Sequence, residues 1–203
     1  MSLSIQDYIV VVENVINDDL CDAIISEYKH APEWRQSLAL NADNNLDHSS
    51  KNRNCSEIDI SNHLVIESNK YVRSRIDQDV FQCVSNATNK YIEKFNNLLI
   101  TKDSGYMLLK YSDGCFYKQH TDSGFDLSHR QLSCSLALND DFDGGEFAFF
   151  DDKIRYRLAK GSAIMFPSNF MYPHQIKPVS NGERYSIVTW LYDGRTSALE
   201  GLG

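Results

Sequence analysis

The sequence predicts a mainly β fold of the α+β class, in which short antiparallel strands form a sandwich or barrel supported by N-terminal helices. Three observations predict this class. After residue 105, β-branched or aromatic segments alternate with Gly, Asp, Asn or Pro, which is typical of short antiparallel strands. Before residue 104, apolar residues recur with helical spacing in two segments. The length of 203 residues suits one domain with a sizeable core, so we expect residues 1–203 to form a single domain.

The N-terminal part is expected to contribute one strand and one short helix. Residues 8–16 read YIVVVENVI, and this β-branched run predicts a strand. Asp18 or Asp19 can cap the helix that follows, because a carboxylate accepts hydrogen bonds from the free N–H groups of a first turn. The helix carries four apolar residues on one side, which we expect to pack on the sheet: Leu20, Ala23, Ile24 and Tyr28.

Two longer segments complete the first half of the chain. Residues 37–61 are rich in Asn, Asp and Ser, so we predict a long surface loop. Such a loop is either a lid over an active site or a plain exposed loop, and both interpretations stay open. Residues 68–97 have helical spacing and predict either one long helix or two helices with a break at Asn86 or Asn89. The aromatic residues of this segment are interpreted as core packing.

Seven strands are predicted in the second half, at residues 106–111, 129–139, 145–150, 154–158, 162–166, 174–179 and 184–192. They would form the core of the domain, at residues 104–193, and the strand, helices and polar loop of residues 1–103 would support it. Gly144 and Gly145 are expected to provide a tight turn or a bulge. The small, polar segment 194–203 is expected to be a frayed tail.

Composition argues against several classes of function. The net charge is −8, with 20 Lys and Arg against 28 Asp and Glu, so the chain has no basic field to attract nucleic acid. The five cysteines are scattered without a C-x-x-C pair, which disfavours a zinc site or a disulfide framework. The apolar runs are short and the N-terminus has no signal-peptide pattern, so we expect a soluble, cytoplasmic protein with no membrane segment.

A candidate metal site is centred on the segment H-T-D. His120 and Asp122 are two residues apart, so on an extended segment their side chains project from the same face. His174, which lies 54 residues after His120, is the best candidate for a third ligand. Two imidazoles and one carboxylate suit non-haem Fe(II) and leave coordination positions open. The alternative is a turn that carries a solvated histidine.

A candidate anion site follows the second histidine. Arg184 heads the segment RYSIVTWLY, which alternates as a strand does, so Arg184 and Ser186 share one face. A planar guanidinium can grip a carboxylate with two hydrogen bonds, and a neighbouring hydroxyl can add another. These two residues therefore predict a site for a buried carboxylate.

Four motifs occur in this order: residues 111–122 (YSDGCFYKQHTD), the Gly-Gly-Glu turn in residues 143–150 (DGGEFAFF), the distant His174, and R-x-S at Arg184. Together they resemble the Fe(II)/2-oxoglutarate-dependent dioxygenases, and more narrowly the prolyl 4-hydroxylase-like branch. The resemblance implies that the predicted strands form a double-stranded β-helix, the jelly-roll core of this family. It also implies Fe(II) on the three predicted ligands, 2-oxoglutarate as co-substrate and O2, with ascorbate as a further candidate cofactor.

The resemblance also implies roles for individual residues. Arg184 would bind the far carboxylate of 2-oxoglutarate, Ser186 would add a hydroxyl donor, and Tyr111 would border the same pocket. Tyr117 resembles a tyrosine nearer the substrate, although both tyrosines could also simply cap the mouth of a barrel. Arg53, in the segment RNCS, loosely resembles an Arg-x-Ser stretch that precedes the substrate-facing strand, so it is a candidate substrate-binding residue.

The resemblance implies an enzyme that hydroxylates a C–H bond, of a prolyl or other residue in a peptide or protein. A second hypothesis is the same chemistry on a free amino acid or small metabolite. A third, from a different class, is a catalytically silent jelly-roll module that binds a metal or ligand. The metal and anion positions are all intact, which argues against a silent module.

Overall fold

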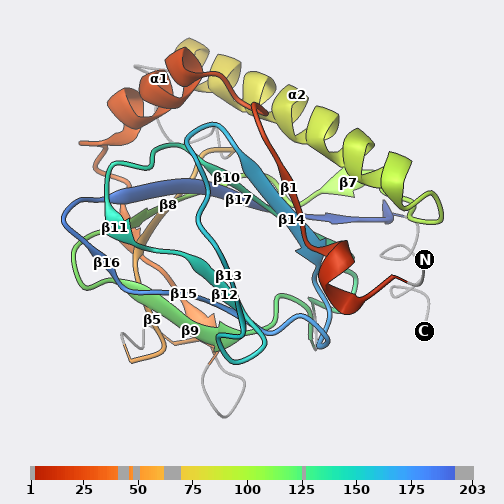
Figure 1. Ribbon diagram of the computed structural model, residues 1–203. Helices are drawn as coiled ribbons and strands as arrows, with labels where there is room; N and C mark the ends of the chain where they lie inside the picture. The colour runs from red at the N-terminus through yellow and green to blue at the C-terminus, as the bar shows by residue number, and fades with distance from the viewer. Residues whose placement is uncertain (1–2, 41–45, 48–50, 62–69, 125–126, 195–203) are drawn as a thin grey trace.

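The computed structural model describes residues 3–40, 46–47, 51–61, 70–124 and 127–194, which are arranged in three layers (Figure 1). Two helices, α1 (Asp18–Tyr28) and α2 (Lys70–Lys94), cover one face of a large sheet. A smaller sheet lies on the opposite side of the large sheet. A short 3₁₀ helix, η1 (Ile5–Tyr8), precedes the first strand.

Both sheets are antiparallel. The large sheet has the strand order β1 (Val10–Val12), β14 (Ala163–Pro167), β10 (Leu132–Ala137), β17 (Arg184–Tyr192), β8 (Met107–Tyr111), β6 (Ser56–Asp59) and β2 (Arg35–Gln36), and β7 (Lys102–Asp103) pairs with β17. The small sheet has the order β13 (Ile154–Tyr156), β12 (Phe147–Phe149), β15 (His174–Ile176), β9 (Phe116–His120) and β5 (Arg53–Asn54). Two short pairs complete the described part: β11 (Asp143–Gly144) with β16 (Val179–Ser180), and β3 (Ala39–Leu40) with β4 (Leu46–Asp47).

Strand alternation divides the core into two apolar clusters. On β10, Leu132, Cys134 and Leu136 belong to the cluster that includes Ile24 of α1 and Val80 of α2. The residues between them therefore face the small sheet. A second cluster lies between the sheets, and its aromatic members are Tyr111, Phe142, Phe147, Phe149, Phe166 and Tyr172. The strand β10 is buried along its whole length, because the helices cover one of its faces and the small sheet covers the other.

The predicted first helix is confirmed, but its cap and its buried face differ from the prediction. Asn17 is the N-cap, and its side chain accepts a hydrogen bond from the Leu20 N–H at 2.8 Å. The two predicted caps, Asp18 and Asp19, lie inside the first turn, where their negative charge still favours the positive end of the helix dipole. The buried face is formed by Cys21, Ile24 and Tyr28, whereas Leu20 is half-buried and Ala23 is exposed.

The second predicted helix is a single helix with no break at Asn86 or Asn89. Its buried positions are Ile76, Val80, Val84, Ala87, Thr88 and Tyr91. The interpretation of its aromatic residues as core was wrong at two positions, because Tyr71 is 92% exposed and Phe81 is 53% exposed. Both lie on the solvent side of a helix whose mean hydropathy is low, so only one narrow face can be buried.

The strands of the second half are largely confirmed, although most are shorter than predicted. Residues 174–179 divide into β15 and the start of β16, and β9, which carries His120, was missing from the predicted strands. The predicted strand at residues 8–16 is reduced to β1, because η1 precedes it and Asn14 adopts a positive φ of 54°. Val15 and Ile16 instead donate backbone hydrogen bonds to the Gly161 carbonyl.

The prediction of a surface loop was wrong for residues 51–61. Within them β5 pairs with β9 of the small sheet and β6 pairs with β8 of the large sheet. Cys55, Ile58 and Ile60 are buried, and they anchor this polar segment to the core. The rest of the predicted loop includes residues 41–45 and 48–50, which lie outside the described residues.

No helix in the described part of the chain is both long enough and apolar enough to cross a membrane. Residues 195–203, most of the predicted tail, lie outside the described residues. Gly194, which precedes them, donates a backbone hydrogen bond to the Thr101 hydroxyl at 2.8 Å.

Candidate metal centre

The two predicted histidine ligands lie on neighbouring strands of the small sheet. β9 ends at His120 and β15 begins at His174, and these residues are direct partners in the antiparallel register. Their imidazole rings are 4.3 Å apart between centroids. Asp122 follows β9 after one residue, so its side chain returns to the same face. Strand pairing thus joins two segments that are 54 residues apart in sequence.

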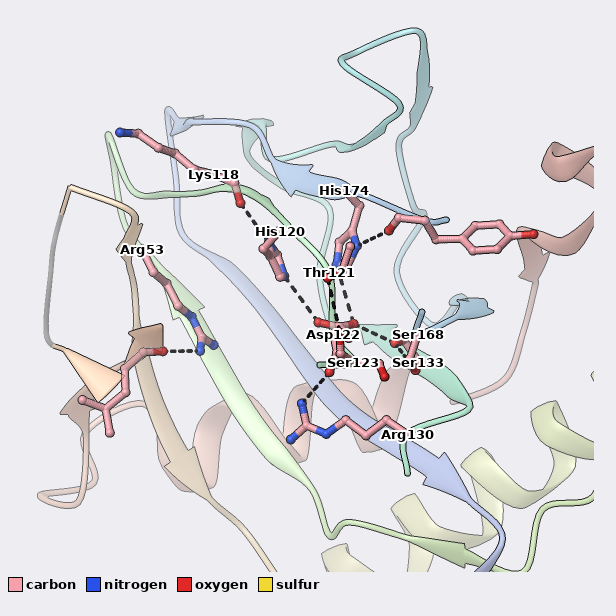
Figure 2. A network of polar contacts seen from close by, with 12 residues as sticks. Arg53, Lys118, His120, Thr121, Asp122, Ser123, Arg130, Ser133, Ser168 and His174 are labelled. Atoms are coloured by element: carbon pink, nitrogen blue, oxygen red, sulfur yellow. Dashed lines mark hydrogen bonds and ion pairs between the residues drawn. The ribbon is translucent and has the colours of Figure 1, made fainter. Parts of the chain in front are cut away.

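The three side chains have a geometry that can hold a metal ion. One ligand atom from each of His120, Asp122 and His174 lies within 4.8 Å of the others. His120 Nε2 is 3.4 Å from Asp122 Oδ1, and His174 Nε2 is 3.6 Å from Asp122 Oδ2. Figure 2 shows both imidazoles pointing toward the carboxylate.

The other nitrogen of each imidazole, Nδ1, already has a hydrogen-bond partner in the backbone. His120 Nδ1 lies 2.8 Å from the Lys118 carbonyl, and His174 Nδ1 lies 3.1 Å from the Tyr172 carbonyl. A carbonyl can only accept, so each Nδ1 carries the proton and each Nε2 presents a lone pair. Such partners orient metal-binding histidines. The donor set of two nitrogens and one carboxylate therefore fits a divalent metal such as Fe(II).

The carboxylate is held by a network that the sequence did not predict. Ser133 Oγ donates to Asp122 Oδ2 at 2.6 Å and lies 2.9 Å from Ser168 Oγ (Figure 2). Arg130 Nη1 donates to the Asp122 backbone carbonyl at 3.1 Å. Burial alone would raise the pKa of Asp122, but the neighbouring side chains of His174, His120 and Ser133 lower it well below its usual value. Asp122 is therefore ionised, as a metal ligand must be.

His174 lies in an aromatic environment. It is 3% exposed, and its ring lies 4.6 Å from that of Phe166 and 5.6 Å from that of Phe149. Burial, and then the proximity of His120, lower the pKa of His174 to about 4. This imidazole is consequently neutral near pH 7, which is the form that binds metals.

A cavity of about 550 Å³ extends from the three side chains to the predicted anion site. Arg184 and Ser186 both line it, and Arg184 Nη1 donates to Ser186 Oγ at 2.8 Å. The guanidinium carbon lies 5.2 Å from the ring centroid of Tyr111, the third predicted cofactor-binding residue. Arg184 is 4% exposed, and within the described part of the chain no carboxylate forms an ion pair with it. A buried cation of this kind requires an anion.

The Gly-Gly turn lies against this arginine. Gly144 and Gly145 both adopt a φ of +67°, which favours glycine. A Cβ on Gly145 would lie 3.0 Å from Arg184 Cδ and 2.8 Å from the Phe142 ring. The turn therefore allows the backbone to approach the side chain that forms the anion site.

The two predicted substrate-binding residues line the same cavity, and one of them lies against a metal ligand. Tyr117 stacks on His120, with ring centroids 3.5 Å apart, and the Arg53 guanidinium lies 4.7 Å from the Tyr117 ring. Arg130, which the sequence did not single out, lies 3.6 Å from the Trp190 ring and also lines the cavity. The structure therefore brings together all eight predicted site residues around one cavity: Arg53, Tyr111, Tyr117, His120, Asp122, His174, Arg184 and Ser186.

Comparisons with known proteins agree with this arrangement. Residues 106–192 match the family model described as the 2OG-Fe(II) oxygenase superfamily. A PKHD-type hydroxylase of Prochlorococcus marinus (strain MIT 9301) is 28% identical over 137 residues, which cover 65% of this chain and 59% of that protein. A PKHD-type hydroxylase of Synechococcus sp. (strain JA-2-3B'a(2-13)) is 31% identical over 90 residues, or 40% of this chain and 39% of that protein. These matches span only about half of each relative.

Solved structures show the same fold. A prolyl hydroxylase from Trichoplax adhaerens, in complex with a hypoxia inducible factor oxygen degradation domain peptide fragment, has a TM-score of 0.74 at 17% identity, covering 95% of this chain and 86% of that one. A Pseudomonas putida prolyl-4-hydroxylase has a TM-score of 0.63 at 19% identity, covering 91% and 92%. The predicted jelly-roll architecture is thereby confirmed.

Proposed function

Because residues 106–192 match the model of the 2OG-Fe(II) oxygenase superfamily, we propose that this chain hydroxylates a C–H bond of a prolyl or other residue in a peptide or protein. One observation carries the proposal. A single cavity holds a two-histidine, one-carboxylate group and a buried guanidinium that has no carboxylate partner among the described residues. A metal and a dicarboxylate can therefore bind side by side.

The residues around the cavity have separable roles in this proposal. His120, Asp122 and His174 would hold Fe(II), and Arg184 with Ser186 would bind the far carboxylate of 2-oxoglutarate. When bound, iron, 2-oxoglutarate and O2 supply the oxidising chemistry for C–H hydroxylation. The protein orients the reactants and keeps water away from them. The aromatic rings packed around His174 serve the second purpose, because they line that side of the site with apolar surface.

The residues beside the metal group favour a peptide substrate. Arg53 over Tyr117, and Arg130 over Trp190, form two cation–aromatic pairs at the cavity. Arginine, tyrosine and tryptophan are the residues that most often anchor protein partners. The Trichoplax adhaerens structure, which contains a peptide fragment, supports the same substrate class.

Two alternatives remain distinct from this proposal. The same residues could hydroxylate a free amino acid or small metabolite, because the cavity is large enough for one. A silent binding module is disfavoured, because the three candidate metal ligands and Arg184, which would bind the anion, are all present. A cytoplasmic location and ascorbate as a reductant belong to the proposal as expectations.

A substrate screen tests the function. The protein is supplied with Fe(II), 2-oxoglutarate, O2 and ascorbate, and succinate release is measured with pools of peptides or free amino acids. Release that depends on a peptide, together with the gain of one oxygen atom in that peptide, is the expected result. Stimulation by amino acids alone would favour the first alternative. Metal and 2-oxoglutarate binding without turnover on any substrate would favour the silent module. Asp122→Ala is the matched inactive control.

A further inference from the structure

Two buried hydroxyls on adjacent strands of the large sheet have no hydrogen-bond partner within the described chain. Ser135 on β10 is 3% exposed and Thr189 on β17 is 1% exposed, and neither Ser135 Oγ nor Thr189 Oγ1 is satisfied. A buried hydroxyl without a partner lowers stability, because it has lost its hydrogen bonds to water. Each therefore requires an explanation.

The two hydroxyls lie on opposite faces of the sheet. Thr189 lies two residues from both Ile187 and Leu191, which belong to the cluster packed against the helices, so it shares their face and its side chain points to that side. Ser135 alternates with Cys134 and Leu136, which also belong to that cluster, so its side chain points to the opposite side. Residues Ser135 and Thr189 both line the cavity, so the direction of each side chain decides which hydroxyl faces it. Because the Thr189 side chain points toward the helices, of this pair only the Ser135 hydroxyl is directed into the cavity.

Strand register places Ser135 between the two ends of the proposed site. Ser133, two residues before it, donates to Asp122 at the metal end. Ala137, two residues after it, pairs across the sheet with Ser186 at the anion end. Residues two apart on a strand are roughly 7 Å apart. A dicarboxylate that extends from the metal group to Arg184 must therefore pass over Ser135.

We propose that the Ser135 hydroxyl is a hydrogen-bond donor to the 2-oxo acid co-substrate, in addition to Arg184 and Ser186. The inference rests on the proposed function, since it takes the 2-oxo acid as the ligand of this cavity. Ser133 cannot replace Ser135 in this role, because its hydroxyl is already bonded to Asp122. An oxygen of the bound 2-oxo acid satisfies the Ser135 hydroxyl, which has no partner when the co-substrate is absent.

This proposal has a specific signature. Ser135→Ala removes a hydroxyl that has no partner in the free protein, so thermal stability without 2-oxoglutarate should be unchanged or higher. Binding of 2-oxoglutarate should nevertheless weaken by about tenfold, the effect of one hydrogen bond to a charged group. Thr189→Val is the matched control, because it removes an equally buried, unpartnered hydroxyl from the other face of the sheet.

The test is a calorimetric titration of 2-oxoglutarate into the Mn(II)-loaded protein under anaerobic conditions, with melting temperatures measured without ligand. Weaker binding in Ser135→Ala, with parental affinity in Thr189→Val and no loss of stability, supports the proposal. Parental affinity in Ser135→Ala overturns it and leaves the proposed function intact. Equal weakening in both variants, or a lower melting temperature in Ser135→Ala, also overturns it. Failure of the parent protein to bind 2-oxoglutarate overturns the proposed function and this inference together.

Discussion

Removing the hydroxyl of Ser133 should weaken metal binding without unfolding the protein. Ser133 Oγ donates to Asp122 Oδ2 at 2.6 Å, and the Asp122 side chain is only 12% exposed. A hydrogen bond to a charged group contributes about 1.5–3 kcal/mol. At about 1.4 kcal/mol per tenfold change, Ser133→Ala should raise the dissociation constant of the metal roughly 10- to 100-fold, the range found for other residues that orient metal ligands.

The assay is an anaerobic titration of Mn(II) into the metal-free protein. Ser133→Thr keeps the donor and should bind the metal as the parent does. Ser168→Ala removes only the neighbour of Ser133 and should change affinity by less than about threefold, since Asp122 retains its hydrogen bond. Parental affinity in a folded Ser133→Ala variant would refute the reasoning, because Asp122 would then be oriented by other groups.

Three further predictions follow from the geometry. Arg184→Lys should weaken 2-oxoglutarate binding by about 10- to 100-fold in anaerobic calorimetry, because an ammonium cannot make the bidentate contact, and unchanged affinity would show that another cation binds the carboxylate. Folding lowers the pKa of His174 from 6.5 to about 4, so the unfolded chain binds the proton first as the pH falls through this range. The free energy of unfolding without metal should therefore decrease by roughly 3 kcal/mol between pH 7 and pH 4, as measured by urea unfolding at several pH values. The same decrease in the His174→Gln variant would contradict this prediction. Gly144→Ala should destabilise the protein by about 2–4 kcal/mol in the same assay, because its Cβ would collide with the Pro178 carbonyl, whereas Gly124→Ala, which has open space around it, should have little effect.

The predicted metal and anion residues were found from the sequence because their chemistry requires particular residue types. No common side chain replaces a histidine or an arginine in these roles, so H-T-D, His174 and Arg184 stood out. Ser133 and Arg130 did not stand out, because neither belongs to a motif that predicts a metal or anion site. Their importance comes from their hydrogen bonds to Asp122, which form only when β10 and the segment after β9 come together in the fold. These contacts with Asp122 can be identified only in the folded chain.

The missed strands have a similar explanation. Residues 116–120 read FYKQH and residues 53–59 read RNCSEID, and neither segment has the apolar alternation of a half-buried strand. They become strands because neighbouring strands satisfy their backbone groups: β9 lies between β15 and β5, and β6 lies between β8 and β2. Tertiary pairing here outweighs local propensity, which is weak for strands.

The pairing of β1 with β14 has a consequence for synthesis of the chain. The partners of Val10, Val11 and Val12 are Met165, Ile164 and Ala163, which leave the ribosome more than 150 residues later. His120 likewise can pair with His174 only after His174 has been synthesised. A metal ion held by His120, Asp122 and His174 could therefore bind only after His174 has been translated, so it would stabilise the paired strands and could not nucleate their folding. During this interval the valines of β1 are an unpaired apolar edge, which a chaperone would have to protect from aggregation.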